Sequence, residues 1–211
     1  MTPGRFISFE GGEGTGKTTQ VTKLTQRLVG AGIDVVETRE PGGTPAAEEI
    51  RRLLVEGDPR RWEPMSELLL HFAARREHLV KVIWPALERG QWVVSDRFAD
   101  STRAYQGYGL GIPETAIEAL YDLAVGNFAP DLTVILDLPV ELGLKRAKWR
   151  GDAAARYERM GQPFHERLRK GFLAIAKENP VRCRVIDATG TLEEIEAAIW
   201  HAVAKRFDLA P

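Results

Sequence analysis

The stretch Arg5–Thr18, RFISFEGGEGTGKT, decides the fold. Its first six residues form an apolar run that is typical of a buried strand, and Gly11–Thr18 then fits the pattern G-x-x-x-x-G-K-[ST]. In such a loop, glycines let successive backbone N–H groups curl around phosphate oxygens, and the start of the following helix adds a favourable dipole. A strand precedes the motif and a helical pattern follows it, so the sequence predicts a phosphate-binding loop rather than a glycine-rich turn without a ligand.

The residues of this loop predict how a nucleoside triphosphate is held. Lys17 is expected to reach the β- and γ-phosphates, and the Thr18 hydroxyl is expected to bind Mg²⁺. Glu13 is unusual, because a carboxylate that pointed inward would repel phosphate. We expect it to point towards a second substrate, with a solvated loop glutamate as the alternative. The residues expected to bind ATP are Gly11, Gly12, Glu13, Gly14, Thr15, Gly16, Lys17, Thr18 and Thr19.

Short apolar runs alternate with longer amphipathic segments along the rest of the chain. This alternation predicts an α/β fold, with five parallel strands between two layers of helices. Ligands bind at the carboxyl ends of the strands in such folds, and the polar motifs of this chain fall at or just after such ends. The expected strands are 5–10, 34–38, 91–95, 132–138 and 182–187, and the expected helices are 17–28, 48–55, 65–88, 114–125, 140–148, 161–179 and 192–207.

Length and charge narrow the class of protein. The chain has 211 residues, so we expect residues 1–211 to form a single domain. Its formal net charge of −1 creates no overall field that would attract nucleic acid or an anionic membrane surface. No leader pattern begins the chain, and no apolar run approaches the roughly 18 residues needed to span a bilayer. We therefore expect a cytoplasmic protein without nucleic-acid or membrane partners.

Cys183 is the only cysteine of the chain. A disulfide framework and a zinc site built from several cysteines are therefore excluded. Cys183 stands in the apolar alternation Val181, Cys183, Val185, which favours a buried structural thiol over a nucleophile.

Residues 38–44 (TREPGGT) end the second expected strand in a rigid turn. Arg39 and Glu40 stand where a phosphate and a hydrated metal would lie if the sheet has the expected order. A surface ion pair is the alternative for these two residues. The same two interpretations apply to Arg51, which lies on the next expected helix.

Asp96 and Arg97 follow the third expected strand. An aspartate after an apolar strand is the usual second support of Mg²⁺ in enzymes with this loop. Arg97 offers a bidentate fork for a monophosphate. The alternative is a capping aspartate beside a surface arginine.

Residues 101–107 (STRAYQG) follow closely. Thr102 and Gln106 lie four positions apart, on one face of a helix, where their side chains can form hydrogen bonds with the edge of a base. Tyr105 is placed to pack on a sugar. Taken alone, these are ordinary helix residues.

The motifs GGEGTGKTT (11–19), TREPGGT (38–44) and DRFADSTRAYQGYG (96–109), in this order and spacing, resemble the bacterial thymidylate kinase family. The resemblance runs from about Phe6 to the final helix. It implies the P-loop NTPase fold of the nucleoside monophosphate kinases, three layers with a small helical lid, and a homodimer. It also implies an enzyme that uses ATP and Mg²⁺ to phosphorylate dTMP to dTDP, a step of dTTP synthesis for DNA replication.

The resemblance further implies roles for individual residues. Glu13 approaches the 3′-hydroxyl of dTMP, Arg97 binds its phosphate, and Tyr105 crowds the 2′ position. Arg75 bonds to a carbonyl of the base, and either His71 or Phe72 stacks on it. The implied dTMP-binding residues are Arg39, Glu40, Arg51, Phe72, Arg75, Arg97, Ser101, Thr102, Tyr105 and Gln106; the metal residues are Thr18, Asp96 and Glu40; the catalytic residues are Lys17, Arg97, Arg150 and Glu13.

A cationic segment, residues 144–151 (LKRAKWRG), resembles the start of the family's lid, which we place at about 146–160. The phosphate loop holds no basic residue besides Lys17, so the lid must supply the further cation. Arg150 is the first choice and Arg146 the second. The family commonly has an aspartate at the position of Ala155, and its absence weakens any role for Arg156. Without the resemblance, a solvated amphipathic helix would be favoured.

Two other functions fit part of the sequence. Another P-loop kinase, acting on a deoxynucleoside or a different monophosphate, would share the first motif. A nucleotide-hydrolysing switch would share it as well, but it would have no use for a cationic lid.

Overall fold

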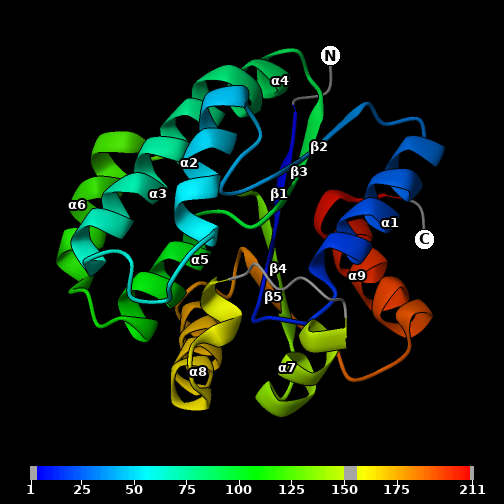
Figure 1. Cartoon of the computed structure of the whole chain (residues 1–211). Coiled ribbons are helices and arrows are strands. Elements are labelled where there is room, and N and C mark those ends of the chain that lie inside the picture. Colours follow the sequence, from blue (N-terminus) through cyan, green and yellow to red (C-terminus); the bar gives the residue numbers. More distant parts are fainter. Residues whose placement is uncertain (1–3, 150–155, 210–211) are drawn as a thin grey trace.

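The computed structural model describes residues 4–149 and 156–209. Its centre is one parallel sheet with the strand order β2-β3-β1-β4-β5 (Figure 1). The expected five-stranded parallel sheet is therefore confirmed, and each strand begins and ends within a residue of its expected position. The strands are β1 (Phe6–Glu10), β2 (Val35–Arg39), β3 (Trp92–Asp96), β4 (Leu132–Asp137) and β5 (Cys183–Asp187).

Helices cover both faces of this sheet, as the alternating pattern predicted (Figure 1). None of the helices in the described part of the chain is both long and apolar enough to cross a membrane. The α-helices are α1 (Lys17–Gly30), α2 (Pro45–Val55), α3 (Pro64–His78), α4 (Trp84–Glu88), α5 (Ala99–Thr102), α6 (Glu114–Ala124), α7 (Val140–Trp149), α8 (Gln162–Glu178) and α9 (Leu192–Phe207). Two wider π-helical segments, η1 (Leu79–Ile83) and η2 (Arg103–Gly109), and one 3₁₀ turn, η3 (Arg156–Arg159), complete the elements.

Strand β1 shows why the sheet is buried on both faces. Successive side chains of a strand point to opposite faces. Ile7 and Phe9 join the apolar core under α1 and α9, whereas Phe6 joins the core on the other face, under α3, α4 and α6. All five residues of β1 are buried, which explains the almost continuous apolar run in the sequence.

The expected helix 65–88 is interrupted in the structure. A regular helix, α3, ends at His78, the wider turn η1 follows, and α4 begins at Trp84. Pro85 lies in the first turn of α4 and has no N–H to donate to the preceding turn. The widened turn before it accommodates that missing hydrogen bond, so the sequence identified the helical segment but not its change of pitch.

Cys183 is a buried thiol, as predicted, but the two valines of the apolar alternation around it are exposed. Burial raises the pKa of Cys183 to about 11, so the thiol stays protonated near neutral pH. Val181 and Val185 are 73% and 45% exposed. The reason is that β5 is an edge strand and Val181 lies before its start.

The strand order brings the predicted motifs together. Strand β3 lies between β2 and β1, and Asp96 is in register with both Phe9 and Arg39. The carboxyl ends of these three strands therefore meet at one edge of the sheet, beside the loop at 11–16.

Candidate active site

The phosphate loop closes around the side chain of Lys17. The ammonium group donates hydrogen bonds to the carbonyl oxygens of Gly11 (3.1 Å) and Gly12 (2.7 Å) and to Thr15 Oγ1 (3.2 Å). Gly16 precedes α1 with a φ of 89°, a backbone conformation that glycine adopts without strain. Burial lowers the pKa of Lys17 to about 8, and the charge of Arg97 adds to this effect. A phosphate anion in the loop would stabilise the charged lysine.

Thr18 and Asp96, the predicted magnesium residues, contact each other. Thr18 Oγ1 donates a hydrogen bond of 2.5 Å to Asp96 Oδ2. Hydroxyl and carboxylate oxygens are the kind of ligand that Mg²⁺ prefers, and this ion usually keeps waters and binds substrate phosphates as well. Within residues 4–149 and 156–209, no group of three or more His, Cys, Asp or Glu could hold a metal by itself. These two residues therefore fit an ion that takes its other ligands from a nucleotide and water.

Arg97 joins the phosphate loop to the opposite wall of the site. It is a non-glycine residue with a positive φ of 77°, and its guanidinium is largely buried. It donates hydrogen bonds to the Gly11 carbonyl (3.0 Å), Ser101 Oγ (3.1 Å) and the Tyr105 hydroxyl (2.9 Å), and it pairs with Glu13 Oε1 at 3.4 Å. Such a backbone conformation is strained, and strain of this kind concentrates at functional sites.

Glu13 points out of the phosphate loop, towards the residues just described. Its Oε1 accepts a hydrogen bond of 2.5 Å from the Tyr105 hydroxyl. Burial alone would raise the pKa of Glu13, but the charges of Arg97 and Lys17 outweigh it and hold the pKa below its usual value. The side chain is therefore a fixed anion on the acceptor side of the loop.

Arg75, on α3, is buried, and one of its guanidinium nitrogens has no hydrogen-bond partner among the described residues. Its Nε donates to Glu40 Oε2 (2.8 Å), and its Nη2 donates to the Phe98 carbonyl (3.2 Å) and Thr102 Oγ1 (3.0 Å). Its Nη1 is buried and has no hydrogen-bond partner among the described residues. A buried donor without a partner is costly, so Nη1 suits a carbonyl group of a ligand.

Gln106, on η2, belongs to a buried polar network with two residues that the sequence analysis did not identify. Its Nε2 donates to Glu67 Oε1 (2.8 Å) and lies 3.3 Å from the Tyr157 hydroxyl. That hydroxyl also donates to Glu67 Oε1 (2.6 Å) and contacts His71 Nε2 (3.0 Å). The network fixes the orientation of Gln106 at the wall of the pocket.

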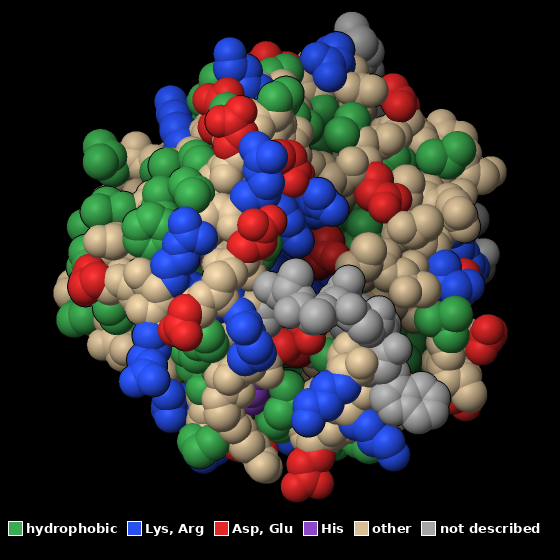
Figure 2. Space-filling model, in the orientation of Figure 1, with side chains coloured by type: hydrophobic (Ala, Val, Ile, Leu, Met, Phe, Trp, Pro, Cys, Tyr) green, Lys and Arg blue, Asp and Glu red, His purple; other side chains and the backbone are tan. Residues whose placement is uncertain are grey.

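These side chains line a pocket that continues into a hollow beside the phosphate loop. Figure 2 shows Lys and Arg side chains gathered beside a hollow near the centre of the visible face, with acidic side chains among them. The pocket is lined by Glu13, Glu40, Pro41, Arg51, Val55, His71, Arg75, Arg97, Phe98, Ser101, Thr102, Tyr105, Gln106 and Tyr157. The hollow is lined by residues 13–18, Val21, residues 37–40, Gly43, Glu48, Arg51, Asp96, Arg97 and Glu158.

His71 and Phe72, the two candidates for stacking on the base, have different surroundings in the structure. Phe72, which the sequence analysis includes among the substrate residues, lies in the apolar core with only 4% of its surface exposed and does not line the pocket. His71 does line it. Burial lowers the pKa of His71 to about 3, with a further effect from Arg75, so the ring is neutral.

Three predicted residues near the second strand have different surroundings. Glu40 is buried, and its oxygens contact Arg75 Nε and His78 Nδ1 (3.1 Å), so both are engaged away from Thr18 and Asp96. Arg39 has a side chain that is 54% exposed and forms a two-bonded pair with Glu48, the surface alternative of the sequence analysis. Arg51 lines both the pocket and the hollow, and its Nη1 donates to the Pro41 carbonyl.

The described parts of the expected lid have distinct contacts, while Arg150 lies outside the described residues. Arg146 donates a hydrogen bond of 3.1 Å to the Ala188 carbonyl. Arg156 is only 1% exposed and pairs with Glu67, which hydrogen-bonds to the pocket residues Gln106 and Tyr157. Its neighbour Glu158 lines the phosphate hollow. The short turn η3 therefore contributes to both the pocket, through Tyr157, and the hollow, through Glu158.

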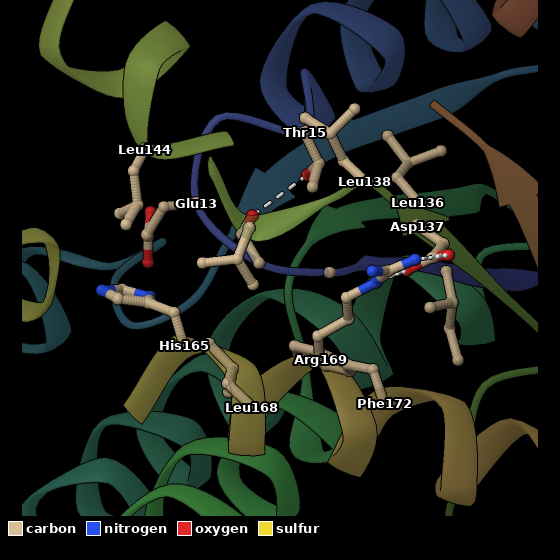
Figure 3. Close-up of a pocket in the computed structure, with 14 residues that line it drawn as sticks. Glu13, Thr15, Leu136, Asp137, Leu138, Leu144, His165, Leu168, Arg169 and Phe172 are labelled. Atoms are coloured by element: carbon tan, nitrogen blue, oxygen red, sulfur yellow. Dashed lines mark hydrogen bonds and ion pairs between the residues drawn. The ribbon is translucent and has the colours of Figure 1, made fainter. Parts of the chain in front are cut away.

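A second, smaller pocket lies under the phosphate loop, between β4, α7 and α8 (Figure 3). His165, on α8, points towards Glu13 in this view. Arg169, one turn further along α8, forms a two-bonded pair with Asp137 at 2.7 and 2.8 Å. Helix α8 is thus tied to the end of β4, close to the loop.

Comparisons with known proteins agree with one another. A family described as "Thymidylate kinase" matches residues 9–199. A protein named thymidylate kinase from Caulobacter vibrioides is 56% identical over 209 residues, 99% of this chain and 100% of its own, and one from Dinoroseobacter shibae is 51% identical over 93% of this chain and 95% of its own. A crystal structure of thymidylate kinase from Ehrlichia chaffeensis matches with a TM-score of 0.77 and 38% identity, covering 95% of this chain and 100% of that one.

Proposed function

Because the chain belongs to the thymidylate kinase family, it is a kinase that phosphorylates dTMP to dTDP, and we propose how its residues carry out this transfer. The observation that supports the proposal best is the position of Arg97. Its guanidinium contacts the phosphate loop through the Gly11 carbonyl and the acceptor pocket through the Tyr105 hydroxyl. A monophosphate at Arg97 therefore lies beside the place where a triphosphate is held, as phosphoryl transfer requires.

On the donor side, backbone N–H groups of the loop and the ammonium group of Lys17 hold the phosphates of ATP. Lys17 exchanges its contacts with the Gly11 and Gly12 carbonyls for contacts with the β- and γ-phosphates. Thr18 and Asp96 hold Mg²⁺, which neutralises phosphate charge. Glu40 is a weaker candidate for this ion, because both its oxygens contact Arg75 and His78.

On the acceptor side, Arg97 binds the phosphate of dTMP, with Arg51 and the exposed side chain of Arg39 contributing positive charge around the hollow. Glu13 accepts a hydrogen bond from the 3′-hydroxyl, and Tyr105 restricts space at the 2′ position. No general base is required, because the acceptor phosphate is already anionic near pH 7. Catalysis then consists of positioning and neutralisation of charge.

The base is held by the far end of the pocket. Arg75 Nη1 donates to a carbonyl of thymine, which satisfies the one nitrogen of this buried side chain that lacks a partner among the described residues. Thr102 and Gln106 contact the edge of the base, and the neutral ring of His71 packs against its face. Of the two alternatives, we assign the stacking role to His71 and not to Phe72.

We also propose that residues from about 146 to 160 act as a lid over both substrates. Arg150 supplies the further cation for the transferring phosphoryl group, with Arg146 as the second choice. Closure excludes water and suppresses hydrolysis of ATP. The phosphate loop offers no basic side chain besides Lys17, and this supports a cation from the lid.

The working form that we propose is a cytoplasmic homodimer formed from one-domain chains. Apolar side chains are exposed on neighbouring helices, where Met65 and Leu69 of α3 and Leu123 of α6 are 37%, 50% and 81% exposed. Burial of such side chains against a second copy would stabilise the pair. Sedimentation equilibrium should give twice the mass of the chain, and a monomer at micromolar concentration would contradict this part of the proposal.

The proposal is tested by measuring ADP release with different acceptors. Purified protein is assayed with ATP, Mg²⁺ and, in turn, dTMP, dUMP, dCMP, AMP or no acceptor. We expect turnover to be fastest with dTMP. Faster turnover with another monophosphate would indicate a different kinase, and ADP release that no acceptor accelerates would indicate a nucleotide-hydrolysing switch.

A further inference from the structure

A buried carboxyl group lies directly behind the residues that face the acceptor phosphate. Glu10 is the last residue of β1, and none of its surface is exposed. It has no part in the transfer described above, and the sequence placed it only at the end of an apolar strand. A buried carboxyl is costly unless it is hydrogen-bonded, so its contacts indicate what it does.

Glu10 first holds the backbone of the turn that presents Arg97. Its Oε1 accepts a hydrogen bond of 2.8 Å from the backbone N–H of Phe98, the residue after Arg97. The N–H of Arg97 itself donates to the carbonyl of Phe9, the residue before Glu10. Strand β1 therefore fixes the turn on both sides of its strained residue, whose φ is 77°.

Glu10 also contacts a hydroxyl group that lines the acceptor pocket. Its Oε2 lies 2.5 Å from Ser101 Oγ. The same Ser101 oxygen accepts a hydrogen bond of 3.1 Å from Arg97 Nη1, and Ser101 is one of the residues that line the pocket. Glu10, Ser101 and Arg97 thus form a chain from the core of the protein to the acceptor phosphate.

The surroundings of Glu10 act on its pKa in both directions. Burial raises the pKa of Glu10 to about 8, and the nearby Asp100 carboxylate adds to this effect, while the hydrogen bond from Ser101 and the charge of Arg97 act in the opposite direction. The other charge that faces it is the ammonium group of Lys17.

The two carboxyl oxygens of Glu10 have separate partners. Oε1 accepts the Phe98 N–H, and Oε2 accepts the Ser101 hydroxyl. The Ser101 oxygen in turn accepts from Arg97 Nη1, so Glu10 fixes the orientation of the hydroxyl group that Arg97 contacts.

We propose that Glu10 is a positioning residue for Arg97: it holds the turn that presents Arg97, and it orients the Ser101 hydroxyl, whose oxygen accepts a hydrogen bond from the Arg97 guanidinium. The inference rests on the proposed binding of the dTMP phosphate at Arg97. It assigns to Ser101 the contact with Arg97. It assigns to Glu10 a role that acts through Ser101 and through the backbone of Phe98.

Variants of Glu10 with different hydrogen-bonding groups test this role. In Glu10→Gln the amide oxygen can accept from Phe98, but the amide nitrogen cannot accept the Ser101 hydroxyl, so only the contact with the turn is kept. In Glu10→Met both contacts are lost at similar side-chain volume. Ser8→Ala is the matched control, because Ser8 lies on the same strand and exchanges a buried hydrogen bond with Thr133 (3.0 Å).

The measurements are the KM for dTMP, the Kd of an ATP analogue and the melting temperature, after wild-type turnover of dTMP has established the parent activity. We expect Glu10→Met to raise the KM for dTMP about tenfold, the size of a lost hydrogen bond to a charged group, with the ATP-analogue Kd within about twofold. Glu10→Gln should raise the KM for dTMP by less than Glu10→Met, because it keeps the contact with Phe98, and Ser8→Ala should lower the melting temperature without a change in KM.

Two results would overturn the inference. A KM for dTMP in Glu10→Met no higher than in Ser8→Ala would show that Glu10 only stabilises the fold. A KM for dTMP in Glu10→Gln equal to that of the wild type would exclude the orientation of Ser101. If Glu10→Met does not fold, Ser101→Ala decides instead: it should raise the KM for dTMP, and an unchanged KM would contradict the role. Absence of dTMP turnover in the wild type would instead refute the parent function.

Discussion

The two halves of the proposed site differ in the groups that they offer to a phosphate. The donor half is local: a loop of eight residues and the start of α1 offer backbone N–H groups and one lysine. The acceptor half is assembled from side chains of α3, α5, η2, η3 and the turn after β3, most of them buried and already hydrogen-bonded to one another. Backbone groups bind any phosphate, whereas a fixed set of side chains selects one molecule, so specificity for dTMP resides in the acceptor half.

The largest effect is expected from Arg97→Ala, which removes the residue that joins the two halves. Transfer to dTMP should fall by about three orders of magnitude, as expected when one partner of a buried charge pair is lost. ATP binding should change little, because Arg97 contacts the donor loop through the Gly11 carbonyl and the Glu13 carboxylate and not through Lys17 or the backbone N–H groups that we propose hold ATP. Steady-state kinetics and titration with a fluorescent ATP analogue measure both quantities.

Arg39→Ala is the matched control for that variant. Arg39 lines the same hollow, but its side chain is half exposed and pairs with Glu48. We expect a loss of less than about tenfold, since exposed pairs contribute little. Equal losses in the two variants would contradict the assignment of the acceptor phosphate to Arg97.

Lys17→Met tests the donor half. We expect kcat to fall about a hundredfold, the effect of removing one preorganised donor from a charged transition state. The KM for dTMP should change by much less, because no acceptor residue hydrogen-bonds to Lys17. Lys23→Met, in the same helix but paired with Glu196 at 2.7 Å, should retain nearly full activity. A large rise in the KM for dTMP would show that Lys17 also contributes to binding of the acceptor, against its assignment to the donor half alone.

Tyr105→Phe removes a single hydroxyl from the acceptor network. That hydroxyl accepts from Arg97 and donates to Glu13. Loss of hydrogen bonds to two charged groups should reduce kcat/KM for dTMP about tenfold and leave the ATP-analogue Kd unchanged. Competition with UMP measures whether the ring itself, which the variant keeps, still excludes a ribose. Unaltered kcat/KM would show that the hydroxyl does not position Arg97 or Glu13.

The smallest effect concerns the charge state of His71. Since burial holds the pKa of His71 near 3, the ring stays neutral from pH 6 to pH 8. His71→Phe should raise the KM for dTMP by less than about fivefold, the value of one hydrogen bond between neutral groups. The ratio of variant to wild-type KM should be the same at pH 6 and pH 8, because ionisation of dTMP cancels. A ratio that changes severalfold would mean that His71 titrates in this range.

The donor half could be predicted from the sequence because its contacts are local. The strand, the glycine pattern, Lys17 and Thr18 all lie within 14 residues, and the register of β1 and β3 then brings Asp96 beside Thr18. The five strands could be predicted for a similar reason, since each is a short apolar run between longer amphipathic segments.

The acceptor network could be predicted only in part, because its contacts join distant residues. Glu67 and Tyr157 are 90 positions apart, and no spacing rule connects them. His71 and Phe72 could not be distinguished because α3 buries side chains on several faces, among them Leu68, Phe72 and His78. Glu10 was overlooked because a carboxylate at the end of an apolar strand gives no sign of the turn that it holds.

The turn η3 places adjacent residues in the two halves of the site. Tyr157 forms part of the wall around the base, and Glu158 lines the hollow that receives the phosphates. We therefore expect a displacement of this turn to alter the affinities for nucleotide donor and acceptor together. A substitution of Tyr157 that evades an inhibitor of the base pocket would carry a cost in the use of ATP whenever it also moves Glu158.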